Sequence, residues 1–316
     1  MIPALIIIGS LLMLTLLIAL VCFFMAFYSP RKKQTDGFSL PPGEIYLPYH
    51  DLMKKWNDEV TAMPHESVYI TTFDGLQLHG KYYEYAKGAP MELMFHGYRG
   101  SAERDLCGGV QRAFALGRNV LLVDQRACGK SEGRVITFGV KESRDCLAWL
   151  SYITERFGEK QKVILTGISM GAATVLCAAG RELPPQVVGI LADCGYTSAK
   201  AIIQKVIDQM GLPSKLLYPF VKLGARLFGS FNVEEISPVE AVTRCTVPVI
   251  FIHGETDGYV PCRMSQENYD ACPTAKRLVT VPDAGHGMAY LVDGKGYLDA
   301  LADFFSENGV KTEVLP

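Results

Sequence analysis

The chain opens with an apolar run from Ile2 to Tyr28 that contains no charged side chain. A helix of this length exceeds the roughly 30 Å hydrocarbon core of a bilayer. A cleaved signal peptide is the alternative, but the run has no basic segment before it and no small-residue cleavage site before Ser29. We therefore expect residues 2–28 to form an uncleaved transmembrane anchor.

Residues 29–66 are predicted to be a linker followed by an amphipathic helix. The part from Gln34 to Pro48 is rich in Pro and Gly, so no helix is expected there. Apolar residues then recur at spacings of three and four, which indicates a helix with one apolar face that packs on the following domain. Contact of this helix with a membrane surface is a weaker alternative, because its polar face carries charges of both signs. The apolar positions are Leu52, Met53, Trp56, Val60 and Met63.

Beyond Ser67 the pattern alternates between extended and helical segments. Ser67–Phe73 and Leu76–Tyr85 flank Asp74-Gly75 and are predicted to form a hairpin of two antiparallel edge strands. Short apolar runs then alternate with helical patterns such as 140–156 and 172–181, which is typical of parallel strands covered on both faces. These runs are 91–95, 120–123, 163–165, 187–191, 249–252 and 277–281. We expect an α/β domain over residues 67–310, with a mostly parallel eight-stranded sheet whose ligands bind at the carboxyl ends of the strands.

The interval 196–243 is too long for a single crossover helix and is predicted to be a small helical cap. Two helices, Ser198–Met210 and Ser214–Phe228, are separated by Gly211-Leu212-Pro213, which ends one helix and begins the next. The second helix is rich in apolar side chains, which we expect to face the mouth of the site. They are Leu216, Leu217, Tyr218, Phe220, Val221, Leu223, Leu227 and Phe228.

The composition, the cysteine pattern and the charges beside the anchor limit the partners the protein can bind and the compartment in which it lies. Apolar residues make up 49% of the chain and the formal net charge is −2, which fits a globular protein and disfavours nucleic-acid binding. The nine Cys form no C-x-x-C pair, so neither a zinc site nor a redox motif is predicted, and we expect reduced, buried thiols. Arg31, Lys32 and Lys33 follow the anchor, and the positive-inside rule then predicts a single-pass protein whose main domain is cytoplasmic.

One motif combines a serine with a sharp turn. Gly167-Ile168-Ser169-Met170-Gly171 directly follows an apolar strand and precedes an Ala-rich helix. The glycines permit a tight strand-to-helix turn that exposes the Ser169 hydroxyl at a helix N-terminus. A structural Gly-rich turn is the alternative. We interpret Ser169 as a nucleophile.

A serine nucleophile needs a base, and the base needs an acid to orient it. His286 lies in a small-residue loop after the last predicted strand, and we prefer it to His253, which ends a strand. Asp257 gives the chain order Ser, Asp, His and is the preferred acid, whereas Asp193, Asp283 and Glu255 remain alternatives. The oxyanion hole is expected from the backbone N–H groups of Met170 and Tyr98.

Together these motifs resemble the α/β-hydrolase superfamily, in particular its small-capped branch of serine esterases, lipases and aminopeptidase-like enzymes, which includes membrane-anchored members. The resemblance covers Ser67 to about Asn308. It implies a Ser169-His286-Asp257 hydrolase without a metal or organic cofactor. The residues that carry it are His96-Gly97-Tyr98, Gly167 to Gly171, Asp257 with Val260-Pro261, Gly285-His286-Gly287, and Asp124 to Ser131, where Ala127 replaces the family's usual Gly.

We expect a small-molecule acyl substrate, cleaved through a covalent acyl-enzyme. A carboxylic ester is favoured because the predicted cap is apolar and the anchor would place the enzyme where apolar esters partition. Glu234-Glu235 is the one acidic pair in the cap that an aminopeptidase could use to hold an α-amino group. A serine aminopeptidase or amidase and an acyltransferase on the same fold remain alternatives, as does a non-catalytic binding protein.

Overall fold

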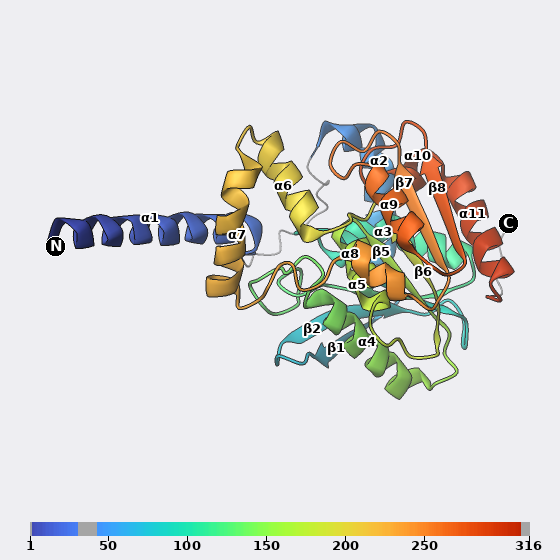
Figure 1. The fold of residues 1–316 in the computed structure, drawn as a ribbon. Coiled ribbons are helices and arrows are strands. Elements are labelled where there is room, and N and C mark those ends of the chain that lie inside the picture. The colour runs from blue at the N-terminus through green and yellow to red at the C-terminus, as the bar shows by residue number, and fades with distance from the viewer. Residues whose placement is uncertain (1, 31–42, 311–316) are drawn as a thin grey trace.

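The computed structural model describes residues 2–30 and 43–310, and its centre is one eight-stranded sheet (Figure 1). The strand order is β1-β2-β4-β3-β5-β6-β7-β8. Every predicted strand is present, with bounds that differ by a few residues. The strands are β1 (Glu66–Thr71), β2 (Gln77–Tyr83), β3 (Met91–Phe95), β4 (Asn119–Val123), β5 (Val163–Ile168), β6 (Val187–Asp193), β7 (Val249–Gly254) and β8 (Lys276–Val281).

Strand pairing confirms a mostly parallel sheet and corrects one detail. β1 pairs with β2 and β2 with β4 in antiparallel fashion, while all pairs from β4 through β8 are parallel. The prediction that the first two strands both lie at the edge was wrong for β2, which lies between β1 and β4. All residues of β2 after Gln77 are buried, as expected for a strand with neighbours on both sides.

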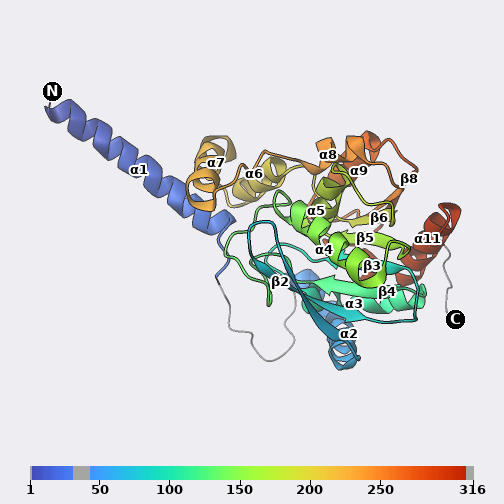
Figure 2. The same ribbon diagram turned by 90° about the horizontal axis from the view of Figure 1, so that it is seen from below.

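Helices cover both faces of the sheet (Figure 2). On one face α4 and α5 pack on the strands, with α8 and α9 beside them. On the other face α3 and α11 cover the sheet and α2 packs against α3. The bounds are α2 (His50–Ala62), α3 (Ala102–Ala115), α4 (Glu142–Phe157), α5 (Met170–Ala179), α8 (Pro238–Ala241), η2 (Val242–Arg244), α9 (Arg263–Ala271), α10 (Ala289–Val292) and α11 (Gly294–Glu307).

The segment before the sheet is more ordered than predicted. Residues 34–42 of the expected irregular stretch lie outside the described residues, but Glu44–Tyr49 forms a 3-10 helix, η1. Its Tyr46 side chain is buried, and this tertiary contact is what the Pro- and Gly-rich pattern could not indicate. The amphipathic helix α2 does pack on the domain: Trp56 stacks on Tyr290 with ring centroids 5.4 Å apart.

The N-terminal helix α1 (Ile2–Ala26) projects away from the sheet (Figures 1 and 2). The cap helix α7 (Ser214–Gly229) packs against its C-terminal part, and α6 (Ala199–Gln209) packs against α7. Among the described residues, Pro3–Ala26 is the one helix long and apolar enough to cross a membrane. Two cap helices broken near Gly211 agree with the sequence pattern.

The cysteines are all free, and seven of the nine are buried. Their placement agrees with the expectation of buried thiols that fill small apolar sites.

Candidate active site

Ser169 lies at the turn between β5 and α5, in a backbone conformation that few residues adopt. Its φ and ψ are 57° and −116°, and such strain persists only where surrounding structure imposes it. The flanking glycines are required by close approach: a Cβ on Gly171 would lie 2.0 Å from the Phe95 carbonyl oxygen, and one on Gly167 would lie 2.2 Å from the Gly171 carbonyl carbon. The turn thus holds the Ser169 hydroxyl at the carboxyl end of β5.

His286 reaches Ser169 from the loop that connects β8 and α10. Its Nε2 lies 2.9 Å from Ser169 Oγ, and its Nδ1 lies 2.7 Å from Asp257 Oδ2. Because a carboxylate can only accept, Nδ1–H donates to Asp257 and the free lone pair of Nε2 accepts the serine proton. The Tyr46 hydroxyl donates to the His286 carbonyl oxygen at 2.7 Å, so η1 fixes the loop that carries the imidazole.

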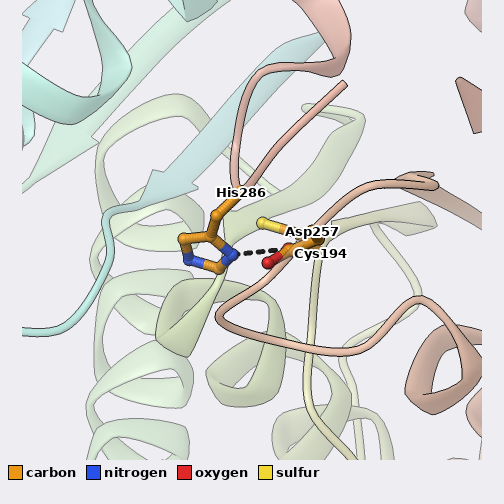
Figure 3. A group of neighbouring side chains, drawn as sticks. All are labelled: Cys194, Asp257 and His286. Atoms are coloured by element: carbon orange, nitrogen blue, oxygen red, sulfur yellow. Dashed lines mark hydrogen bonds and ion pairs between the residues drawn. The ribbon is translucent and has the colours of Figure 1, made fainter. Parts of the chain in front are cut away.

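Asp257 follows β7 and is held on both oxygens. Oδ1 accepts the backbone N–H groups of Tyr259 and Val260, each at 2.8 Å, while Oδ2 faces His286 (Figure 3) and also His253. Burial alone would raise the pKa of the Asp257 carboxyl, but the hydrogen bonds from His253 and His286 hold that pKa well below its ordinary value. The carboxylate is therefore charged at neutral pH and suited to stabilise an imidazolium.

Among the described residues, no hydrogen bond or ion pair joins any of the three alternative acids to His286. Asp193 accepts the Tyr297 hydroxyl at 2.8 Å, and burial raises the pKa of its carboxyl, which favours the neutral form. Glu255 accepts the Thr280 hydroxyl at 2.7 Å, and Asp283 is exposed. Among these four carboxylates, the geometry selects Asp257.

His253 has a supporting position that the sequence reasoning missed. This fully buried imidazole directs Nε2 at Asp257 Oδ2 (3.1 Å) and at the Val260 carbonyl oxygen (2.9 Å). Both are acceptors, so Nε2 carries the proton, and Nδ1 accepts from the Ser265 hydroxyl at 2.6 Å. The four-residue spacing between His253 and Asp257 was the available signal. His253 thus holds Asp257 in place, while the imidazole within hydrogen-bond distance of Ser169 is that of His286.

Cys194 is a second neighbour that the sequence reasoning did not single out. Its sulfur lies beside the hydrogen-bonded pair of Asp257 and His286 (Figure 3), and ligand atoms of the three residues lie within 4.8 Å of one another. Burial raises the pKa of the Cys194 thiol well above its ordinary value, and a neutral thiol is a poor metal ligand. These three side chains are better described as a hydrogen-bonded aspartate–histidine pair with a neutral thiol beside it than as the ligands of a metal ion.

The loop after β3, which carries the second predicted oxyanion donor, lies against the serine. A Cβ on Gly97 would lie 3.6 Å from Ser169 Cβ, so Tyr98 follows the residue that touches the nucleophile. Met170 begins α5, where the first N–H groups have no partner within the helix. Among the described residues, neither the Tyr98 nor the Met170 N–H has a hydrogen-bond acceptor. Both are available to a developing oxyanion.

The Asp124–Ser131 loop has a structural role. The Asp124 carboxylate accepts the backbone N–H groups of Ala102 and Lys130 at 3.1 and 3.0 Å, which ties the loop to the start of α3. Ala127 has a φ of 63°, a left-handed conformation that favours glycine. The chain therefore accepts some backbone strain where the family pattern has Gly.

This sheet order, the strained serine turn and the Ser169-His286-Asp257 arrangement define an α/β-hydrolase fold. A family model described as alpha/beta hydrolase fold matches residues 93–227. The chain has the α/β-hydrolase fold, and the family match over these residues supports its place in the α/β-hydrolase superfamily.

The chain is also similar to individual known proteins. YqkD of Bacillus subtilis is 27% identical over 199 residues, and the match covers 63% of this chain and 65% of YqkD, slightly less than two thirds of its length. YfhR of Escherichia coli is 26% identical over 299 residues, covering 92% of this chain and 93% of YfhR. The crystal structure of the Pyrococcus furiosus esterase PF2001 is similar with a TM-score of 0.64 and 23% identity, covering 87% of this chain and 99% of the esterase. At 23% identity, the similarity to the esterase is a similarity of fold alone.

Proposed function

We propose that this protein is a membrane-anchored serine hydrolase that cleaves carboxylic esters. The observation that carries the proposal is the continuous hydrogen-bonded series from Ser169 Oγ through His286 to the charged Asp257 carboxylate. A purely structural serine would have no need of a strained turn at the N-terminus of a helix.

The chemistry follows from these contacts. His286 Nε2 takes the proton of Ser169 Oγ as that oxygen attacks the acyl carbonyl carbon, and Asp257 stabilises the resulting imidazolium. The N–H groups of Met170 and Tyr98 bind the oxyanion, each contributing a few kcal/mol of barrier reduction. His286 then protonates the leaving alcohol, the acyl group stays on Ser169, and a water molecule activated by His286 releases the acid.

The apolar surroundings of Ser169 favour uncharged esters over peptide or amide substrates that carry an ammonium group. Met170, Tyr98 and Val260 belong to one apolar cluster that also includes cap residues and the end of α1. Glu234, which an aminopeptidase could use to hold an ammonium group, forms an ion pair with Lys222 instead. The expectation that the apolar side chains of 216–228 face the mouth is not supported as a whole, because Tyr218 and Val221 pack inward with the body. The fold similarity to an esterase agrees with the proposal.

Substrate preference provides the direct test. The full chain in detergent should hydrolyse p-nitrophenyl esters between acetyl and decanoyl with a higher kcat/KM than any aminoacyl or dipeptidyl p-nitroanilide. The reason is that Glu234, one of the acidic pair in the cap, already pairs with Lys222 and is not free to neutralise a substrate ammonium group. Initial rates with matched chromophores measure both classes.

Two outcomes would redirect the proposal. Higher kcat/KM for the amides would make the protein a peptidase or amidase, and no turnover of either class would favour a binding protein. Added alcohols give the control for acyl transfer: ester products that exceed the free acid would identify a transferase.

We further propose that α1 is retained as the membrane anchor and that the hydrolase domain is cytoplasmic. Arg31, Lys32 and Lys33, which carry the positive-inside argument, lie outside the described residues. Lys215 and Arg226 on α7 add positive charge at the same end of α1.

Protease access tests this topology. In intact cells or right-side-out vesicles, added protease should leave the domain whole, and it should digest the domain after lysis. The measurement is an immunoblot against a C-terminal tag. Digestion without lysis would show that the domain lies on the opposite side of the membrane.

A further inference from the structure

The cap helix α7 carries apolar side chains on the face that points away from the protein. Tyr218, Val221 and Ala225 are buried against the body. At 100° per residue, the opposite side of the helix carries a stripe at spacings of four, three and four. We call this stripe the outward face. Its members are Leu216, Phe220, Leu223 and Leu227, of which Leu216 is 66% and Leu227 51% exposed.

The two flanks of this outward face differ. On one flank α1 packs closely: a Cβ on Gly224 would lie 2.4 Å from the Ala19 carbonyl oxygen, and Phe228 meets Phe23 with ring centroids 5.8 Å apart. On the other flank the side chains are cationic. They are Lys215, Lys222 and Arg226. Lys222 pairs with Glu234, whereas Lys215 and Arg226 form no ion pair among the described residues.

α1 is held to the body by several different contacts, so its direction relative to α7 is fixed. The Tyr98 hydroxyl donates to the Ala26 carbonyl oxygen at 2.7 Å, and the Arg99 guanidinium donates to the Tyr28 carbonyl oxygen at 2.8 Å. The Phe27 ring packs edge-on against the rings of Phe138 and Phe231. Both views show α1 extending past α7 on the side away from the sheet (Figures 1 and 2). The outward face of α7 therefore points to the side that the free part of α1 occupies.

The length of α1 determines how near α7 must come to a bilayer. Spanning a hydrocarbon core of about 30 Å takes about 20 helical residues. Even if the span begins as far out as Pro3, Ala19 lies only about 24 Å along the helix, at 1.5 Å per residue. The point where α7 packs on α1 is then still within the hydrocarbon boundary.

We propose that the outward face of α7 is inserted in the acyl and headgroup boundary of the bilayer that α1 spans, with Lys215 and Arg226 at anionic headgroups. The inference rests on the proposed anchor and assigns a partner, the lipid surface, to an exposed apolar stripe. Exposed leucines beside a cationic flank are the pattern of helices that lie in a membrane interface. The cap then holds the hydrolase against the membrane, where an ester dissolved in the bilayer can reach it.

Fluorescence quenching by lipid tests the insertion. The full chain is reconstituted in vesicles of phosphatidylcholine and phosphatidylglycerol, with or without bromine atoms on the acyl chains. Single substitutions Leu227→Trp and Leu216→Trp place an indole on the outward face, Leu12→Trp places one on α1, and Tyr69→Trp places one on β1, where Tyr69 is 56% exposed. The emission of Trp56 and Trp149 is measured on the parent protein and subtracted.

The proposal expects brominated lipid to quench the added emission in the Leu227→Trp, Leu216→Trp and Leu12→Trp proteins and to leave that of the Tyr69→Trp protein unchanged. Quenching in the Leu12→Trp protein without quenching at either α7 position overturns the inference and leaves the anchor in place. No quenching at any of these three positions overturns the anchor itself. Having two α7 positions keeps the test valid if one of the two variants fails to fold.

Discussion

Ser169→Ala should lower kcat for ester hydrolysis by about 10⁴- to 10⁶-fold, since removal of the nucleophile disables a catalytic unit that acts together. The fold should survive, because alanine removes one hydroxyl, and among the described residues His286 is the only side chain that hydroxyl bonds to. Initial rates of ester hydrolysis at saturating substrate measure kcat. A fluorophosphonate probe should label the parent protein at Ser169 and leave the variant unlabelled.

The matched control is Ser151→Ala. Ser151 is exposed on α4, and its hydroxyl donates to the carbonyl oxygen of Leu147 within the same helix. This variant should retain parental activity and labelling. A folded Ser169→Ala protein with turnover within about tenfold of the parent would refute the proposed nucleophile.

Asp257→Asn should reduce kcat by about 10³- to 10⁴-fold with little change in KM. Both oxygens of Asp257 accept hydrogen bonds, Oδ1 from two backbone N–H groups and Oδ2 from His253 and His286, whereas asparagine has only one accepting oxygen. Either the amide N–H₂ faces His286, which reverses the imidazole tautomer, or the imidazolium loses its counter-charge. The first removes the Nε2 lone pair that accepts the Ser169 proton, and the second makes the imidazolium that forms less stable.

Asp193→Asn is the control for this second prediction. Asp193 is also a buried carboxyl at the end of a neighbouring strand, but it bonds to Tyr297, and an amide oxygen can accept that hydroxyl equally well. Because burial raises the pKa of Asp193, the neutral amide resembles its favoured form, and kcat should stay within about tenfold of the parent. If folded Asp193→Asn were the more impaired protein, the assignment of the acid would move to β6.

The periodic parts of the fold were predictable because local rules apply to them. Strands buried on both faces, such as β3 and β5, have continuous apolar runs that are hard to mistake once helical patterns separate them. β2 was placed at the edge because a hairpin pattern specifies the partner within the hairpin and says nothing about the strand on the other side. The 3-10 helix η1 was missed because burial of Tyr46 under a distant loop stabilises a segment whose composition suggests irregular structure.

In the candidate active site, too, some features could be predicted from the sequence and others only from the structure. The two glycines around Ser169 and the small-residue loop around His286 are visible in the chain because the steric demands of a tight turn select residue types locally. The sequence favours Asp257 but leaves Asp193 as an alternative, because both carboxylates lie between the serine and the histidine in the chain, and only the distances in the structure separate them.

The sequence by itself determined the apolar N-terminal helix, the alternation of strands and helices, and the turn that presents Ser169, because each depends on neighbours a few residues away. Only the tertiary structure decided which carboxylate meets His286, that His253 holds this carboxylate, and that α1 packs on Gly224 of the cap and on the Tyr98 loop. These contacts join segments many residues apart. They depend on how the sheet and the cap bring backbones together, which no local pattern encodes.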